Sequence, residues 1–368
     1  MAPLAAVCDY QAQARKRLPR LVRDYLEGGA EDLRTLGRNR RAFEALLFKP
    51  RILIDVAQVE PGVELFGKCL AMPAIVGPTG LNGLYFPCAE EALARAAHRA
   101  GLPFVLSTAS TSLLEDVRRA TSGELWLQLY VQQDRSIAQR MMERARDAGY
   151  SVLMLTADTP VHGVRDHDVR NRFKMPLRIT PRLLADLLTH PRWCLRMLRQ
   201  GGSPQLVNLA RSAGQAPNLR AQAATMSRQM DMALDWRAIG WLRDHWPGRI
   251  LVKGILSVED ARLARVHGAD GIVLSNHGGR QLDSAPSPLE VLPAVADEVG
   301  GALAVLVDGG VRRGSDIAKA RALGARAVLL GRAPLYGLAA CGPQGVDAVL
   351  GILRSELETC LRLLGRPH

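Results

Sequence analysis

The 368-residue chain is 48% hydrophobic and 23% charged, and it has a formal net charge of +12. These proportions are typical of a globular protein and exclude a disordered or fibrous chain. No apolar run approaches the roughly 20 residues that a transmembrane helix needs, and residues 1–20 lack the apolar core of a signal peptide. We therefore expect a folded protein that stays in the cytoplasm.

The cysteines are scattered, without a CxxC pair and without histidines at the spacing of a metal site. They are Cys8, Cys69, Cys88, Cys194, Cys341 and Cys360. This pattern argues against a disulfide framework and against a metal centre, so all of them are expected to be reduced.

Short apolar runs alternate with helix-like segments from residue 71 onward. The predicted strands are residues 72–76, 103–106, 125–130, 152–156, 250–252, 271–274, 304–307 and 327–330. The predicted helices between them are residues 90–100, 137–148, 257–267 and 315–323. A glycine follows each of these helices, as expected of a residue that ends a helix in the left-handed conformation.

Eight strands with intervening helices predict an α/β fold, a single (β/α)8 TIM barrel. The barrel takes residues 71–160 and 223–368. Residues 1–70 are expected to form an N-terminal helical cap over one end, and residues 161–222 a long insertion after the fourth strand. A doubly wound open sheet is the competing architecture, but residues 77–80 after the first strand lack its G-x-G-x-x-G fingerprint.

The active site of such a barrel lies at the C-terminal ends of its strands. Polar or glycine residues follow every predicted strand: Pro78, Thr79 and Gly80; Ser107 and Thr108; Tyr130; Thr156 and Asp158; Lys253; Ser275, His277 and Arg280; Asp308, Gly309 and Gly310; Gly331 and Arg332. A basic nucleic-acid-binding protein would explain the net charge, but it would give these residues no purpose. We therefore expect an enzyme and no nucleic-acid partner.

The loops after the last two strands predict a phosphate site. They combine the glycines Gly309, Gly310 and Gly331 with the guanidinium groups of Arg312 and Arg332, and a helix begins after each loop. Backbone N–H groups at a helix N-terminus and arginine side chains both bind phosphate. Glycines used only for close packing are the alternative explanation.

Acid–base residues also stand at strand ends. His277 is the natural general base, since an imidazole titrates near neutral pH, and Asp158 could orient it. Arg165 and Arg280 are two guanidinium groups able to hold a carboxylate. Lys253 has three open roles from spacing alone: a Schiff-base lysine, a phosphate partner, or a fixed positive charge beside an electron-accepting ring.

At these residues the chain closely resembles the FMN-dependent 2-hydroxy acid oxidase and dehydrogenase family. The matching motifs run through nearly the whole chain: Tyr25-Leu26-Glu27-Gly28-Gly29-Ala30, Pro78-Thr79-Gly80, Gln128-Leu129-Tyr130, Thr156-Ala157-Asp158, Lys253-Gly254, residues 275–283, residues 308–314 and Gly331-Arg332. The stretch around His277 is highly specific for this family.

The resemblance implies that FMN lies across the barrel mouth. Its phosphate would be held by Gly309, Gly310, Arg312, Gly331 and Arg332; its ribityl chain by Lys253 and Asp308; and its ring by Pro78, Thr79, Ser107, Gln128, Thr156 and Lys253. Gly80 and Ser275 would also belong to the cofactor site. The substrate carboxylate would be held by Arg165, Arg280 and Tyr25, with Tyr130 on the hydroxyl side. His277, backed by Asp158, would remove a proton.

Within the family the resemblance is strongest to the branch that oxidises (S)-mandelate to phenylglyoxylate, through residues 78–83, 190–193, 226–231 and 241–244. L-lactate dehydrogenases and 2-hydroxy acid oxidases of the family are the alternative, and a Schiff-base aldolase using Lys253 is a distant one. Gly80 stands where oxidases commonly carry alanine. We therefore expect a quinone or another carrier, rather than O2, to accept the electrons.

The insertion has a composition suited to an anionic membrane surface at the inner face of the cell membrane. Residues 180–209 combine Leu183, Leu184, Leu187, Leu188, Trp193, Leu195 and Leu198 with Arg182, Arg192, Arg196 and Arg199. A soluble lid that packs on the barrel is the alternative. The resemblance also implies a homo-oligomer, a tetramer, although the chain stops at His368 without the longer tail expected of the mandelate branch.

Overall fold

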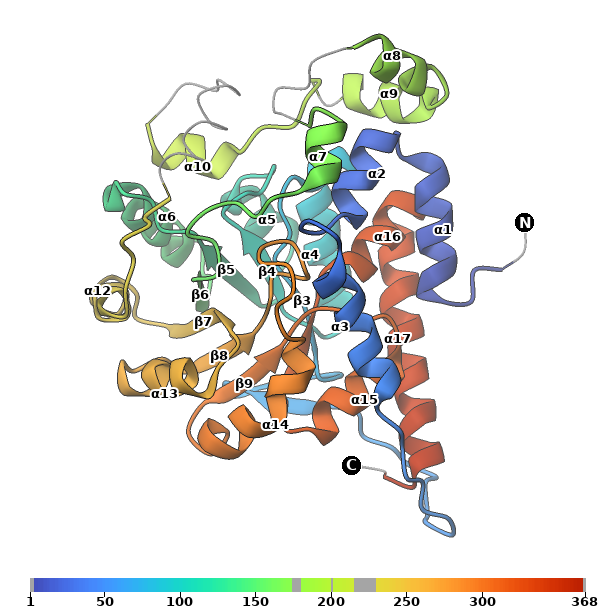
Figure 1. The fold of residues 1–368 in the computed structure, drawn as a ribbon, viewed down its shortest axis with the longest axis vertical. Coiled ribbons are helices and arrows are strands. Elements are labelled where there is room, and N and C mark those ends of the chain that lie inside the picture. Colours follow the sequence, from blue (N-terminus) through green and yellow to red (C-terminus); the bar gives the residue numbers. More distant parts are fainter. Residues whose placement is uncertain (1–2, 174–179, 200, 215–229, 367–368) are drawn as a thin grey trace.

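The computed structural model describes residues 3–173, 180–199, 201–214 and 230–366. Its centre is a closed barrel of parallel strands in the order β10-β3-β4-β5-β6-β7-β8-β9. The strands are β3 (Ala74–Val76), β4 (Phe104–Ser107), β5 (Leu125–Leu129), β6 (Val152–Thr156), β7 (Arg249–Ile255), β8 (Gly271–Leu274), β9 (Ala304–Val307) and β10 (Ala327–Leu330). The predicted TIM barrel and its eight strands are confirmed (Figure 1).

Each strand is buried on both faces, which explains why its sequence is a continuous apolar run instead of an alternating one. In β9, Leu306 belongs to the cluster that fills the barrel, whereas Val305 and Val307 pack outward against the helices. β10 repeats the arrangement, with Leu329 inside and Val328 outside. The barrel interior is therefore a packed core that holds the strand ends in fixed positions.

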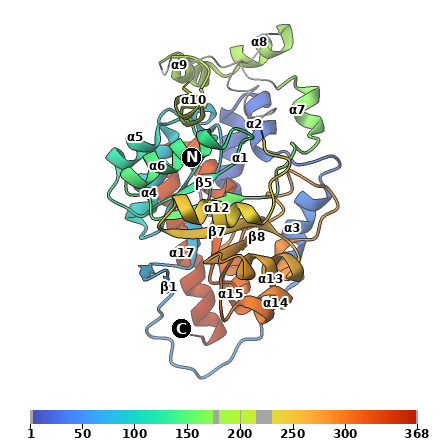
Figure 2. The same cartoon turned by 90° about the vertical axis from the view of Figure 1, so that its left-hand side faces the viewer.

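Helices surround the barrel (Figures 1 and 2). They are α4 (Ala89–Arg99), α5 (Leu114–Ala120), α6 (Arg135–Asp147), α12 (Arg237–His245), α13 (Val258–Val266), α14 (Pro288–Val299), α15 (Gly314–Ala322), α16 (Arg332–Cys341) and α17 (Pro343–Leu364), with a short 3-10 turn η1 (Asn82–Leu84). The four predicted helices correspond to α4, α6, α13 and α15. The sequence did not predict α5, α12, α14, α16 and α17. For α14 a signal was present, because Ser287 and Glu290 form a capping box at its start.

The first 70 residues do more than cap one end. They form α1 (Val7–Arg17), α2 (Arg20–Glu27), α3 (Arg34–Ala45) and a hairpin of β1 (Val63–Leu65) and β2 (Lys68–Leu70). The hairpin closes the N-terminal end of the barrel: Leu65 and Leu70 join the interior cluster, and the ring centroid of Phe66 lies 6.0 Å from that of Trp126. The predicted cap over a single end was therefore incomplete.

The insertion lies at the opposite end, above the C-terminal ends of the strands (Figures 1 and 2). It contains α7 (Asp166–Arg170), α8 (Pro181–Leu188), α9 (Pro191–Arg199) and α10 (Val207–Ser212). The backbone N–H of Arg20, at the start of α2, donates to Asp186 Oδ2 of α8 at 2.6 Å. Among the described residues, we find no helix with the length and apolar character to span a bilayer. Most of the motif at residues 226–231 lies outside the described residues.

Candidate active site

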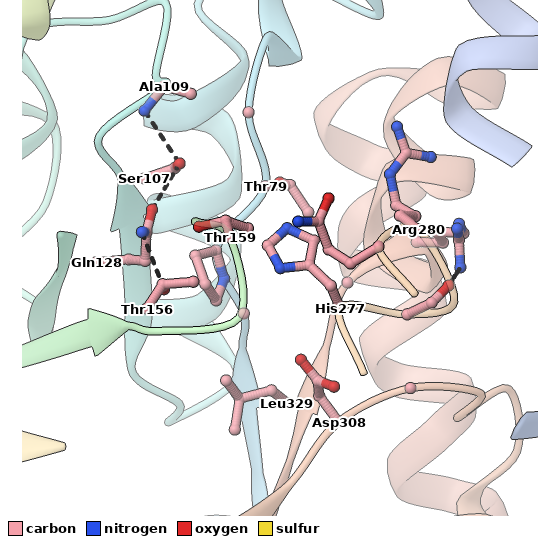
Figure 3. A pocket seen from close by; sticks show the side chains of 18 of the residues that line it. Thr79, Ser107, Ala109, Gln128, Thr156, Thr159, His277, Arg280, Asp308 and Leu329 are labelled. Carbon is pink, nitrogen blue, oxygen red and sulfur yellow. Dashed lines mark hydrogen bonds between the residues drawn. The ribbon is translucent and has the colours of Figure 1, made fainter. Parts of the chain in front are cut away.

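His277 stands at the centre of a cavity in the C-terminal face of the barrel, with its ring directed into it (Figure 3). Its Nδ1 lies 2.9 Å from Asp158 Oδ1, and its Nε2 lies 3.4 Å from the hydroxyl of Tyr130. The backbone at His277 is left-handed, with φ of 57°, a conformation rare outside glycine and asparagine. The carboxylate therefore fixes the Nδ1 side of the ring and leaves the Nε2 side to meet a ligand.

Lys253 lies between two buried carboxylates. Its Nζ is 2.9 Å from Asp308 Oδ2, 4.0 Å from Asp158 Oδ2 and 2.6 Å from Ser275 Oγ. Burial alone would lower the pKa of Lys253, but the two carboxylates outweigh it and hold the pKa above its ordinary value. The pKa of Asp158 is lowered in spite of its burial, because the His277 ring and the Lys253 ammonium group beside it favour the charged carboxylate. Lys253 is thus a fixed cation, which argues against the Schiff-base role, since that role needs a neutral amine.

Gly254 allows Asp158 to lie close to Lys253 and His277. It has φ of 111°, and a Cβ there would lie 2.6 Å from the Cβ of Asp158. Any side chain at this position would therefore push Asp158 away from Lys253 and His277.

A chain of hydrogen bonds lines the opposite wall (Figure 3). The backbone N–H of Ala109 donates to Ser107 Oγ at 3.1 Å, and this hydroxyl donates to Gln128 Oε1 at 2.9 Å. Gln128 Nε2 in turn donates to Thr156 Oγ1 at 3.0 Å. All of these side chains are buried and come from the ends of β4, β5 and β6. They present a fixed set of polar atoms to a planar ligand in the cavity.

Arginines crowd the side of the cavity formed by β9 and β10. Arg332 donates to the carbonyl oxygens of Leu26, Gly28 and Gly278. Burial, together with the positive charges of Arg280 and Arg312, lowers the pKa of Arg332 to about 10. Neither Arg312 nor Arg332 has a carboxylate partner within salt-bridge distance among the described residues. This part of the cavity therefore favours an anion.

Tyr25 organises the outer part of the cavity. The guanidinium carbons of Arg280 and Arg165 lie 4.9 Å and 5.8 Å from its ring centroid, and the ring of Phe173 stacks on it at 4.4 Å. Arg280 donates to the backbone oxygen of Tyr25 at 2.8 Å. Arg165 instead forms an ion pair, with its Nε 3.4 Å from Asp168 Oδ2. Two guanidinium groups thus face one region of the cavity, as expected for a carboxylate site.

The structure brings nearly all predicted site residues together. The cavity is lined by Tyr25, Pro78, Thr79, Gly80, Ser107, Gln128, Tyr130, Thr156, Arg165, Lys253, His277, Arg280, Asp308, Gly309, Gly310, Arg312, Gly331 and Arg332. Asp158 and Ser275 do not line it. They lie behind His277 and Lys253, where Ser275 Oγ also accepts from the backbone N–H of His277 at 3.0 Å, so the structure places Ser275 as a support beneath the site.

Sequence reasoning missed several lining residues, among them Ala109, Thr159, His162 and Met230. Thr159 and His162 follow the end of β6, so the rule that active-site residues follow the strand ends could have predicted both of them. Burial, followed by the nearby guanidinium group of Arg165, lowers the pKa of His162. Met230 carried no such signal, because it lies 74 residues after the end of β6.

Comparison with known proteins decides the family. The model of the FMN-dependent dehydrogenase family matches residues 14–368. The chain belongs to this family. It is 52% identical over 359 residues to (S)-mandelate dehydrogenase of Pseudomonas putida, covering 98% of this chain and 90% of the relative. It is 40% identical over 362 residues to L-lactate dehydrogenase of Caulobacter vibrioides, covering 98% and 94%.

Solved structures agree with the sequence relatives. A crystal structure of (S)-mandelate dehydrogenase, described as a monotopic membrane protein, superposes with a TM-score of 0.95 at 51% identity, over 99% of this chain and 96% of that one. A mandelate oxidase bound to (S)-2-phenylpropionate superposes with a TM-score of 0.84 at 35% identity, over the same shares. The protein is therefore an FMN-dependent 2-hydroxy acid dehydrogenase, and the aldolase alternative is excluded.

The residues present fit FMN. Asp308 Oδ1 is buried and has no hydrogen-bond partner among the described residues, so it can accept from a ribityl hydroxyl. Gly309 and Gly310 are left-handed, and a Cβ on Gly310 would lie 2.5 Å from the backbone oxygen of Asn39. Their N–H groups, with the uncompensated Arg312, suit the phosphate. When bound, FMN supplies a two-electron acceptor, and the positive charge of Lys253 suits the charge that such an acceptor gains.

Proposed function

We propose that the protein oxidises (S)-mandelate to phenylglyoxylate and passes the electrons to a membrane quinone or another carrier. The observation that carries this proposal is the His277–Asp158 pair. The pair faces a cavity with two separate regions: a carboxylate site at Arg165 and Arg280, and a flavin site at the strand ends. Identity of 52% to a mandelate dehydrogenase supports the aromatic substrate.

The side chains divide the reaction between them. Arg165 and Arg280 hold the substrate carboxylate, and Tyr130 lies on the side of His277 where the hydroxyl group would bind. Burial raises the pKa of the Tyr130 hydroxyl, so this group stays a neutral hydrogen-bond donor. His277 Nε2 takes a proton from the substrate, and Asp158 stabilises the imidazolium that forms. Oxidation removes two electrons and two protons in total.

Colour gives the direct test. We expect the purified protein to be yellow and to bleach anaerobically within the mixing time of a manual experiment when (S)-mandelate is added. (R)-Mandelate is the matched control, and L-lactate is the competing substrate of the relatives that are 40% identical. Faster bleaching with L-lactate than with (S)-mandelate would replace the mandelate proposal with the lactate one.

Gly80 supports a carrier over O2 as the acceptor, because oxidases of the family commonly carry alanine there. A Cβ at Gly80 would lie 2.9 Å from the Cβ of Ala109, so an alanine there would require the two loops to move slightly apart. Reoxidation of the bleached protein should be slow in air-saturated buffer and fast with a soluble quinone. Fast reoxidation by O2 would identify an oxidase.

We further propose that the protein binds peripherally to the inner face of the cell membrane through α8 and α9. Leu184, Leu188, Leu195 and Leu198 are 50%, 76%, 48% and 74% exposed, and Arg192 and Arg199 are exposed beside them. Apolar side chains flanked by arginines suit the surface of an anionic leaflet. The expectation that Trp193 joins this surface was wrong: it is buried, and its Nε1–H donates to the carbonyl oxygen of Leu84 at 2.8 Å.

A homo-oligomer, a tetramer, is part of the same proposal. The segment between α3 and β1 extends away from the barrel (Figure 1), and it exposes Leu47, Ile52 and Leu53 at 90%, 82% and 99%. Apolar side chains exposed to this degree on one segment are typical of a surface that a partner covers. Light scattering coupled to size exclusion should give four times the 40.0 kDa mass of the chain, and a monomer would contradict the proposal.

A further inference from the structure

The insertion contributes a buried side chain to the support of the flavin cavity. Asn208, on α10, is 1% exposed. Its Nδ2 donates to Ser110 Oγ at 2.7 Å and to the backbone oxygen of Ser112 at 2.9 Å. Its Oδ1 accepts from the backbone N–H of Leu114 and from Arg144 Nη2, both at 3.0 Å. Both donors and both acceptor positions of the amide are therefore used.

The segment that Asn208 holds, residues 107–113, forms a wall of the cavity. Ala109 lines the cavity and belongs to a small apolar cluster with Ile137, Leu206 and Leu209. The backbone oxygen of Ala109 accepts from the N–H of Leu81 at 2.9 Å, and Ala109 contacts the loop at Gly80. Asn208 thus binds Ser110, which directly follows Ala109 of the cavity wall.

The insertion meets the neighbouring loop as well. Trp193 donates to Leu84, and the guanidinium carbon of Arg196 lies 5.0 Å from the ring centroid of Phe86. A Cβ on Gly83 would lie 3.0 Å from the Cβ of Pro204. The loops that follow β3 and β4 both contribute residues to the cavity wall. Both loops therefore pack against the side of the insertion that faces the barrel.

We infer that Asn208 is a positioning residue for the flavin site. It acts through Ser110 and Ser112 on Ala109 and Ser107, and it does not touch the cavity itself. Only the kinetic test of this inference, with (S)-mandelate, rests on the proposed function. The affinity for FMN tests it independently, because the position of the wall also determines how tightly FMN binds. Glu90 holds the other side of this segment, since it accepts from the backbone N–H and hydroxyl of Thr111 and from the hydroxyl of Ser112. Loss of the two hydrogen bonds that Asn208 donates therefore loosens chiefly Ser110, and Ala109 and Ser107 shift with it.

Asn208→Asp separates positioning from general stability. The carboxylate keeps the acceptors for Leu114 and Arg144, but it has no N–H to donate to Ser110 and Ser112. Tyr150→Phe is the matched control: it removes the hydrogen bond from the Tyr150 hydroxyl to the backbone oxygen of Leu114 at 3.0 Å, at the start of α5 and outside residues 107–113. Ser110→Ala removes the acceptor on the wall side, together with the hydrogen bond that the Ser110 hydroxyl donates to the backbone oxygen of Ser112 at 2.7 Å. It tests the contact between Asn208 and the wall where changes at Asn208 prevent folding.

The readouts are the Kd of FMN for the apoprotein, the visible circular dichroism of bound FMN, KM and kcat for (S)-mandelate, and the thermal midpoint. We expect Asn208→Asp and Ser110→Ala to raise the Kd and the KM about five- to tenfold, the size of effect that loss of one or two hydrogen bonds produces. Both variants should also change the dichroism. Tyr150→Phe should lower the thermal midpoint and leave the other readouts within a factor of about two of wild type.

Two results would overturn the inference. One is an Asn208→Asp or Ser110→Ala protein whose FMN affinity, dichroism and KM equal those of wild type. The other is a Tyr150→Phe protein that shows the same changes, since the effect would then be general destabilisation. If wild type fails to bleach with (S)-mandelate, the proposed function fails, but the FMN affinities and the dichroism still decide the role of Asn208.

Discussion

His277 and Asp158 are 119 residues apart in the chain, and their side chains meet at 2.9 Å. They come from loops after β8 and β6, with Lys253 of β7 between the two strands. The carboxylate is shared, since Lys253 also lies 4.0 Å from it. One buried carboxylate therefore orients the general base and also neutralises the cation beside the flavin site.

Substitutions of the pair should separate chemistry from cofactor binding. His277→Ala should keep FMN bound and lose anaerobic bleaching by (S)-mandelate. Asp158→Asn should slow bleaching by roughly 10²- to 10⁴-fold, because the imidazolium loses its stabilising charge. Stopped-flow absorbance measures both rates, and the ratio of FMN to protein absorbance is the control. Full-rate bleaching in His277→Ala would remove His277 as the base.

The ion pairs of Lys253 with Asp158 and Asp308 should make the stability of the folded protein depend on pH. The folded-state pKa of Asp158 lies below its ordinary 3.8, so its stabilising contribution is present above that value and is lost as pH falls through the lowered pKa. The pKa of Lys253 lies above its ordinary 10.5, so its contribution is present below that value and is lost as pH rises through the raised pKa.

Lys253→Met should therefore be costliest near neutral pH. It leaves two buried carboxylates without their cation, at a cost of about 3–5 kcal/mol. Burial then raises the pKa of Asp158, so the loss of stability should shrink as pH falls toward about 4.5. Urea unfolding of the apoprotein at both pH values measures the difference, with the exposed Lys68→Met as control. An equal loss at both pH values would contradict the ion-pair explanation.

The two arginines should differ in what they contribute. Arg165 makes an ion pair with Asp168 at the edge of the cavity, so Arg165→Met should lower kcat/KM for (S)-mandelate by roughly 10- to 100-fold through the lost charge-assisted hydrogen bond, with little change in thermal midpoint. Arg280 also donates to backbone oxygens of Tyr25 and Gly28, so Arg280→Met should lower both quantities. Mandelamide, which lacks the carboxylate charge, is the control substrate. An equal loss with mandelamide in Arg165→Met would argue against carboxylate binding.

The barrel was predictable because its strands carry unambiguous patterns. The apolar runs at 271–274, 304–307 and 327–330 have the observed bounds, and the polar residues at their ends identify the mouth. The hairpin was missed because its strands have three residues each. Its turn is made by Phe66 and Gly67 with φ of 52° and 75°, without the asparagine or aspartate that usually indicates such a turn.

The supports of the site could not be predicted, since they depend on contacts between distant segments. Asp283 accepts from the backbone N–H groups of Arg34 and Thr35, and so it caps α3 in place of Leu33, whose side chain cannot cap a helix. Asn39 and Asn276 exchange amide hydrogen bonds at 2.8 and 2.7 Å. Such pairs leave no periodic pattern in either segment.

Membrane binding should depend on the exposed leucines of α8 and α9. Leu188→Ser with Leu198→Ser should weaken flotation with anionic vesicles at low salt by at least about tenfold, because each leucine would bury apolar surface in the leaflet. Val266→Ser with Leu363→Ser is the matched control, since these side chains are 74% and 73% exposed on α13 and α17, away from the insertion. Unchanged flotation of the first variant, or equal loss in both, would exclude α8 and α9 as the membrane surface.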